Sequence, residues 1–262
     1  MKVIHLSDLH LGRSNNIKKI ARIREWIINH REQHGAEVIV ISGDITNDGD
    51  KRQFLKARAV IEDLREAGFR VLVVPGNHDY GPLGITESTR SAKHFRRLLA
   101  GGKEYPRLEY IEGNAFVLLN SMQGEFRSVE MIGAEGQLGR VQLEELEGIL
   151  ESLHDDPKVD RVVVILHHHP FDYKKFHVLR DARRFLKVLS GGDRDRSWTG
   201  VVLFGHKHID HRFNDPGQNR EAQYGLDLIY AAGSAVEQDP EGKFVIPVID
   251  LNDLVIERFR FH

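Results

Sequence analysis

The sequence predicts an α/β fold built around parallel strands. Its 262 residues are 40% hydrophobic, which is enough for one large core. Short runs rich in β-branched residues alternate with stretches that carry apolar residues three to four positions apart. This strand–helix–strand order implies parallel strands joined by right-handed crossovers.

The first third of the chain shows this alternation most clearly. Strands are expected at residues 2–7, 38–42 and 71–74. One helical face between them carries Ile17, Ile20, Ile23 and Ile27 within residues 17–33. A second helical face carries Phe54, Ala57, Ile61 and Leu64. Gly35 and Gly68 are expected to end these two helices.

The rest of the chain follows a less regular pattern. Strands are expected at residues 116–120, 162–166, 201–204, 228–231, 244–249 and 255–261. Helices are expected near residues 90–99, 137–153 and 178–189, with a long loop at 121–136. The last two strands read as a hairpin around Asn252 and Asp253. No repeat or linker is visible, so residues 1–262 are expected to form a single domain.

Composition and charge exclude several classes of protein. The 37 basic and 39 acidic residues give a net charge of -2, so a large basic face for duplex DNA is not indicated, although a local patch can hide in a balanced total. The absence of cysteine excludes disulfides, thiolate metal sites and a cysteine nucleophile. No signal region and no apolar run approaching 18 residues is visible, so a cytoplasmic protein without a membrane partner is expected.

Polar side chains follow five of the predicted strands directly. They are Asp8-Leu9-His10, Gly43-Asp44, Gly76-Asn77-His78-Asp79, His167-His168-His169-Pro170 and Gly205-His206-Lys207-His208. Since the carboxyl ends of parallel strands meet at one ligand-binding edge, these segments are expected to converge. Aspartate, asparagine and neutral histidine suit Mn, Fe, Zn, Co or Ni. A lone aspartate at a strand end is usually a cap or turn residue, so the prediction of a metal site rests on the combination.

These motifs, in this order over residues 8–208, resemble those of the calcineurin-like metallophosphoesterases. The resemblance implies a four-layer α/β/β/α sandwich of two mixed β-sheets flanked by helices. It also implies two divalent or trivalent metal ions, for which we expect Mn, Fe, Zn or Co, at the carboxyl ends of the strands. By this resemblance the first ion is held by Asp8, His10, Asp44 and His208. The second is held by Asp44, Asn77, His168 and His206, with Asp44 as the bridge.

Only one of the three adjacent histidines is expected to be a metal ligand. The family's ligand stands two residues before the proline, which selects His168. His167 and His169 are expected to point to the opposite side of the extended segment, as packing residues or as outer partners of the site.

The resemblance also implies a reaction in which metal-bound hydroxide attacks phosphorus in line. Protonated His78 is expected to lie beyond the metals and to stabilise developing charge or give a proton to the leaving oxygen. Asp79 is expected to accept a hydrogen bond from the His78 imidazole and to hold its orientation.

The segment after the second strand, GDITNDG, resembles the bacterial branch with cyclic-nucleotide and glycerophosphodiester phosphodiesterases. A 3',5'-cyclic nucleotide or a glycerophosphodiester is therefore the expected substrate. Selectivity is expected from the loops at residues 80–90, 121–136, 171–177 and 210–226. Candidates for base stacking or phosphate contact are Tyr80, Phe171, Tyr173, Arg13, Lys207 and His211.

Three alternatives stay open. A phosphomonoesterase or a DNA nuclease of the same superfamily is one, because SDLHLG at residues 7–12 is also typical of the nuclease branch. The DNA-recognition region that is usual in the nuclease branch is not visible, and neither is a basic patch, so nucleic acid is not expected as a partner. A non-catalytic scaffold is another, although such relatives lose ligands that this chain keeps. The C-terminal strands are expected to complete the second sheet, with a homodimer as the alternative.

Overall fold

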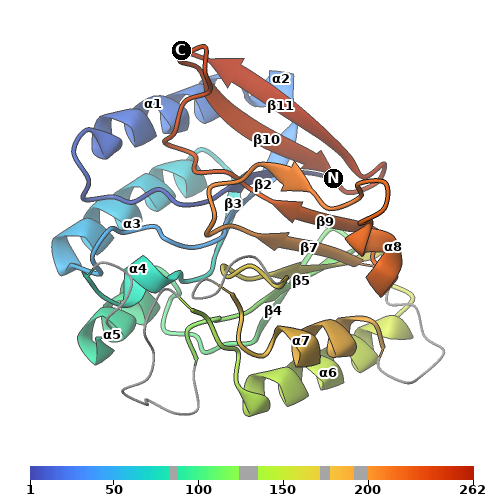
Figure 1. Cartoon of the computed structure of the whole chain (residues 1–262). Helices are drawn as coiled ribbons and strands as arrows, with labels where there is room; N and C mark the ends of the chain where they lie inside the picture. Colours follow the sequence, from blue (N-terminus) through green and yellow to red (C-terminus); the bar gives the residue numbers. More distant parts are fainter. Residues whose placement is uncertain (83–87, 124–134, 172–177, 192–199) are drawn as a thin grey trace.

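Two mixed β-sheets pack face to face, and helices cover the outer face of each (Figure 1). The computed structural model describes residues 1–82, 88–123, 135–171, 178–191 and 200–262. This arrangement confirms the α/β/β/α sandwich that the family resemblance implied.

The first sheet contains the N-terminal strands and has the order β11-β10-β1-β2-β3. Its parallel strands are β1 (Lys2–Leu6), β2 (Ala36–Ile41) and β3 (Arg70–Val73). The connections contain α1 (Asn16–Asn29), α2 (Arg31–His34) and α3 (Lys51–Glu66). Gly35 ends α2 in the left-handed conformation, as predicted.

The C-terminal hairpin joins this same sheet. Strand β10 (Phe244–Asp250) pairs antiparallel with β1, and β11 (Val255–Phe261) pairs antiparallel with β10. The predicted hairpin is therefore confirmed. The hairpin belongs to the sheet of β1 to β3, so the expectation that the C-terminal strands complete the second sheet is wrong.

The second sheet has the order β4-β5-β6-β7-β9-β8. Its strands are β4 (Arg107–Ile111), β5 (Asn114–Leu118), β6 (Arg161–Ile165), β7 (Gly200–Phe204), β8 (His211–Arg212) and β9 (Leu228–Ala231). The remaining helices are α4 (Asn77–Tyr80), α5 (Thr89–Leu98), α6 (Arg140–His154), α7 (Ala182–Leu189) and α8 (Arg220–Tyr224). Sequence periodicity missed β4, β8, α4 and α8, because short or half-exposed elements carry little of it.

Strand alternation places the core in three layers. Val38 and Val40 of β2 face the second sheet, whereas Ile39 and Ile41 face α1 and α3. The second sheet packs Val163 and other inward residues against the first, and its outer face is covered by α6 and α7. No helix in the described ranges is long and apolar enough to cross a bilayer.

The predicted apolar face of α1 is wrong at its first position. Ile17 is 44% exposed, and Asn16 is buried in its place. The amide nitrogen of Asn16 donates hydrogen bonds to the backbone oxygens of Leu9 and His10, both at 3.1 Å. The start of α1 therefore anchors the polar loop that follows β1.

Candidate metal centre

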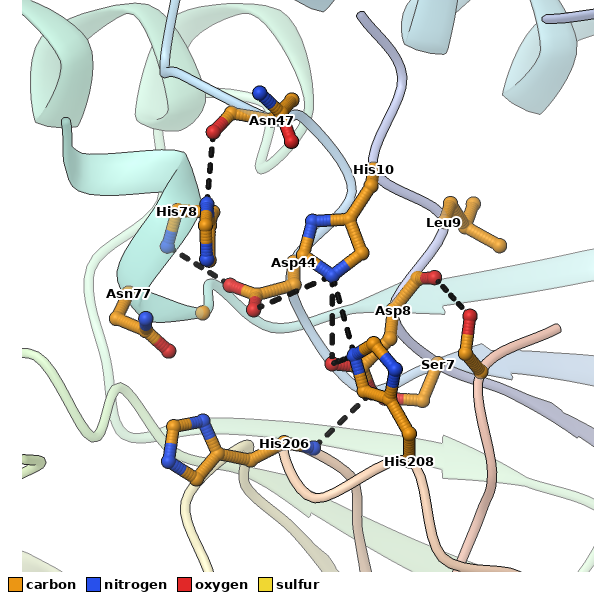
Figure 2. Close-up of polar contacts among 12 residues, drawn as sticks. Ser7, Asp8, Leu9, His10, Asp44, Asn47, Asn77, His78, His206 and His208 are labelled. Atoms are coloured by element: carbon orange, nitrogen blue, oxygen red, sulfur yellow. Dashed lines mark hydrogen bonds and ion pairs between the residues drawn. The ribbon is translucent and has the colours of Figure 1, made fainter. Parts of the chain in front are cut away.

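Six of the predicted ligand residues gather at the edge formed by the carboxyl ends of the parallel strands. Asp8 and His10 follow β1, Asp44 follows β2, Asn77 follows β3, and His206 and His208 follow β7 (Figure 2). The first two loops are joined by backbone hydrogen bonds from Asp8 to Gly43 and from His10 to Asp44. The predicted convergence of segments about 200 residues apart is confirmed.

The backbone at five of these six residues is left-handed. The φ angles are 54° at Asp8, 45° at His10, 50° at Asp44, 76° at His206 and 55° at His208. Each such non-glycine residue costs on the order of 1–3 kcal/mol. Strain of this kind, repeated at five polar side chains of one edge, is typical of a functional site.

The first cluster consists of Asp8, His10 and His208. Asp8 Oδ1 lies 3.2 Å from His208 Nε2 and 3.9 Å from His10 Nε2. The two Nε2 atoms of His10 and His208 lie 3.3 Å apart, so ring nitrogens face each other across a small space. A backbone hydrogen bond from His206 to Asp8 Oδ2, at 3.0 Å, holds the carboxylate in place.

The second cluster consists of Asp44, His167 and His206. His167 Nε2 lies 3.4 Å from Asp44 Oδ2, 3.2 Å from His206 Nδ1 and 3.2 Å from Asn77 Oδ1. Asp44 also joins the two clusters, since its Oδ2 atom lies 4.0 Å from His10 Nε2.

His167, and not His168, faces this second cluster. Alternation along β6 explains the difference, because Val163 and Ile165 face the first sheet and His167 continues their side. The His168 ring packs beside this cluster, with its centroid 4.5 Å from that of His206, but its Nδ1 atom lies 2.7 Å from Ser121 Oγ and it is not one of the three grouped ligand residues. The prediction that His167 points away is therefore wrong. His169, as expected, is a packing residue, surrounded by Phe171, Phe204 and Phe213.

The predicted partner of His78 is also different. Asp79 is buried and accepts hydrogen bonds from the backbone of Ile45, Thr46 and Gly76, so it ties the β2 loop to the β3 loop. His78 Nδ1 instead lies 2.8 Å from the backbone oxygen of Asn47 (Figure 2). Since a carbonyl only accepts, Nδ1 carries the hydrogen, which leaves Nε2 for other partners.

Electrostatics at the clusters reflect two buried carboxylates. Burial opposes ionisation of Asp44, yet the charge of His167 holds the pKa of Asp44 below its usual value. Burial likewise opposes the charged form of His167, but the Asp44 carboxylate raises the pKa of His167 to about 9. In the same way, despite burial, the bond to Asp8 raises the pKa of His208 to about 9. The carboxylates thus draw positive charge into both clusters.

Two glycines allow the loops to approach the clusters closely. A Cβ atom on Gly43, at φ 97°, would lie 2.5 Å from His167 Nδ1. A Cβ atom on Gly76 would lie 2.3 Å from Asp44 Oδ1 and 2.4 Å from the Asp44 backbone nitrogen. The loops after β2 and β3 therefore reach this spacing only with glycine at both positions.

We expect Gly76→Ala to displace Asp44 and to lower the free energy of unfolding by roughly 1–3 kcal/mol. Gly148→Ala is the matched control, because a Cβ atom there meets nothing within 4 Å. In the middle of α6, alanine should raise stability by about 0.5–1 kcal/mol. Urea unfolding of both variants checks this, and equal stability of Gly76→Ala and the wild type would contradict the crowding.

The residues predicted to contact the substrate lie in different environments. Phe171 is 6% exposed and packs on Phe204 and Phe213, so the expectation that it stacks on a base is wrong. Tyr80 accepts a hydrogen bond from Asn120, whereas Tyr173 lies outside the described residues. Arg13 is exposed, and its Nε atom donates to Asn47 Oδ1 at 2.7 Å.

The remaining selectivity predictions concern loops and surface charges. His211 pairs with Asp215 at 2.9 Å, and Lys207 is half-buried. The loop predicted at 210–226 contains β8 and α8. The other predicted loops lie partly outside the described residues, which leave out 83–87, 124–134 and 172–177.

Comparison with known proteins identifies the family. The calcineurin-like phosphoesterase model matches residues 1–210. The chain belongs to this family. A probable cyclic nucleotide phosphodiesterase of Coxiella burnetii is 25% identical over 222 residues, which cover 80% of this chain and 77% of that protein.

Two further relatives match this chain over a shorter stretch. A probable cyclic nucleotide phosphodiesterase of Xenorhabdus bovienii is 35% identical over 88 residues, or 30% of this chain. A component of the SbcCD nuclease of Staphylococcus epidermidis is 31% identical over 86 residues, also 30% of this chain. The matched parts span 34% and 23% of the lengths of these two relatives.

Solved structures of the same fold belong to proteins with different names. A dimetal phosphatase from Danio rerio has a TM-score of 0.67 at 17% identity and covers 95% of this chain and 91% of its own. A purple acid phosphatase from yellow lupin has a TM-score of 0.60 at 12% identity, covering 99% and 53%. GAP50 of Plasmodium, described as the anchor in the inner membrane complex, has a TM-score of 0.58 at 12% identity, covering 99% of this chain and 84% of its own. These likenesses show the fold alone.

Proposed function

We propose that this chain is a dinuclear metal-dependent phosphodiesterase that hydrolyses a small phosphodiester. The observation that carries the proposal is the pair of adjacent clusters, Asp8–His10–His208 and Asp44–His167–His206, which Asp44 connects. Neighbouring sites with carboxylate and imidazole ligands suit two cations that act on one phosphate.

The donor set fits two metal ions. We assign Asp8, His10, Asp44 and His208 to the first and Asp44, Asn77, His167 and His206 to the second, with His167 in place of His168. The clusters hold two buried carboxylates whose charge now raises the pKa of His167 and of His208. Bound cations supply that positive charge instead, and their binding releases protons. Mn, Fe, Zn and Co all accept such ligands. When bound, the metals polarise the phosphate ester and lower the pKa of bound water.

The protein's own groups around this centre have separate proposed tasks. His78 donates Nδ1–H to the backbone oxygen of Asn47, which fixes the orientation of its ring and leaves Nε2 free of this bond. The ring lies beside that of His10, and the two ring centroids are 4.7 Å apart. In its protonated form His78 is placed to stabilise the leaving oxygen or to give it a proton. The side chain of Asn47 holds Arg13, whose exposed guanidinium is suited to the phosphate oxygens.

A cyclic nucleotide or a glycerophosphodiester is the proposed substrate class. The GDITNDG segment and the two relatives named as probable cyclic nucleotide phosphodiesterases support it. The Coxiella relative supports it most, because that match extends over 80% of this chain.

A nuclease is the second candidate, and a basic groove on α5 favours it. Arg90, Lys93 and Arg97 of α5 and Lys51 of α3 are exposed. A groove of about 870 Å³ is lined by Arg90, Lys93, His94, Arg96 and Arg97, and also by Thr89, Gly102 and Glu104, which pairs with Arg96. Helix α5 has no acidic residue and adjoins α4, which carries His78, through a hydrogen bond from Ser88 to Tyr80. Burial and the charges of Lys51, Arg97 and Arg90 lower the pKa of His94. This is a local patch of the kind that the balanced net charge can hide.

A substrate panel with added Mn²⁺ separates the candidates. It compares a 3',5'-cyclic nucleotide, a glycerophosphodiester, a phosphomonoester and single-stranded DNA, each with the wild type and with the triple variant R90E, K93E and R97E. We expect the small diesters to be hydrolysed best and the triple variant to hydrolyse them as the wild type does.

Other outcomes of the panel would support the alternatives. Preferred cleavage of DNA would support the nuclease. In that case the slope of log DNA affinity against log salt concentration should be about 2 smaller in the triple variant than in the wild type. A preference for the monoester would support a phosphomonoesterase. Metal-loaded protein that hydrolyses none of the four would support a scaffold.

A further inference from the structure

The loop at residues 232–239, between β9 and β10, packs directly against the first cluster. This loop lies beyond residues 1–210, which the family model matches. Ser234 Oγ donates to the backbone oxygen of Asp8 at 2.8 Å, and the backbone nitrogen of Ala235 donates to Ser7 at 2.9 Å. Lys19 Nζ donates to the backbone oxygen of Val236 at 2.9 Å. The loop is thus held in place by the turn that follows β1 and by α1.

Glu237 in this loop contacts the outer nitrogen of His208. Glu237 Oε1 lies 2.7 Å from His208 Nδ1, while His208 Nε2, on the other side of the ring, lies 3.2 Å from Asp8 Oδ1. A carboxylate only accepts, so Nδ1 carries a hydrogen toward Glu237. When a metal ion displaces the proton on Nε2, the lone pair of Nε2 would point into the cluster. A carboxylate that holds a histidine in this way orients the ring and makes its inner nitrogen a stronger metal ligand.

His10, the other ring of the first cluster, has no equivalent restraint. Its Nδ1 atom is buried and makes no hydrogen bond within the described part of the chain. The geometry points to Glu237 as a positioning residue of the metal centre, which orients His208 and strengthens its hold on the first metal ion. This inference rests on the proposed function, since it needs a metal at the first cluster.

The same contact contributes little to folding. Glu237 is 58% exposed and His208 is 26% exposed. Exposed ion pairs of this kind stabilise a fold by about 0–1 kcal/mol. The effect of Glu237 is therefore expected in metal affinity, where such outer partners are worth about 10–100-fold.

The test is metal binding by the full-length, metal-free protein, measured with Mn²⁺ by calorimetry and with Co²⁺ by its visible absorption. Glu237→Gln keeps the shape and removes the charge, while Glu237→Ala removes the contact. Glu241→Gln is the matched control, because Glu241 is also exposed and pairs with Lys243 outside the clusters.

We expect two metal ions to bind the wild type, and one of the two to bind about 10–100-fold more weakly in both Glu237 variants. The Co²⁺ spectrum of that site should change, and Glu241→Gln should match the wild type. Thermal unfolding without metal should be the same for all; if Glu237→Ala unfolds early, the Gln variant carries the test.

Unchanged affinity at both sites in both Glu237 variants would overturn the inference and leave the proposed function standing. A wild type that binds no metal would overturn both. The two failures are therefore distinguishable.

Discussion

Asp44→Asn is expected to lose metal at both clusters and with it the hydrolysis of phosphate esters. Asp44 Oδ2 lies 3.4 Å from His167 Nε2 and 4.0 Å from His10 Nε2, so one carboxylate faces both sites. A unit charge about 4 Å from a cation is worth on the order of 4 kcal/mol near a protein surface, which is about a thousandfold in affinity for each ion. No other acidic side chain among the described residues belongs to the second cluster to replace it.

The measurement is metal content after dialysis, together with the rate of diester hydrolysis. Asp227→Asn is a suitable control, because that carboxylate pairs with Arg161 beside the amino end of β7, away from the clusters. Retention of both ions by Asp44→Asn would show that the two sites do not share this residue.

His78→Ala is expected to keep both metal ions and to lower turnover by roughly 10²–10⁴. The His78 backbone nitrogen donates to Asp44 Oδ1 at 2.8 Å, and this bond survives the substitution. The lost part is the imidazole, whose Nδ1 atom is held by Asn47 and whose Nε2 atom is oriented for proton donation. If His78 protonates the leaving oxygen, the substitution should slow hydrolysis of an ester with a nitrophenyl leaving group less than hydrolysis of a nucleoside ester.

Turnover and metal content should be measured on the same samples, with His94→Ala of α5 as the control. The contrary outcome has a structural basis. His78, His10 and Asp44 also have ligand atoms within 4.8 Å of one another. A loss of metal in His78→Ala would therefore make His78 a ligand and leave the proton donor unassigned.

The site was largely visible in the local sequence. Runs of β-branched residues that end in Asp, Asn or His predicted both the strands and the edge at which their polar residues meet. Asp8, His10, Asp44, Asn77, His206 and His208 lie there because the connectivity of parallel strands brings their carboxyl ends together. Motif order also identified the family, which the match over residues 1–210 bears out.

Side-chain direction and long-range partners were decided only by the tertiary structure. His167 and His168 are chemically identical neighbours, and only the packing of β6 against the first sheet determines which of them faces Asp44. Asp79 accepts hydrogen bonds from the backbone N–H groups of Ile45 and Thr46, which lie 34 and 33 residues away in another loop. Glu237 is 29 residues from His208 and follows no motif. Periodicity and spacing are local properties of a chain, whereas these contacts depend on how distant loops pack, which local patterns do not encode.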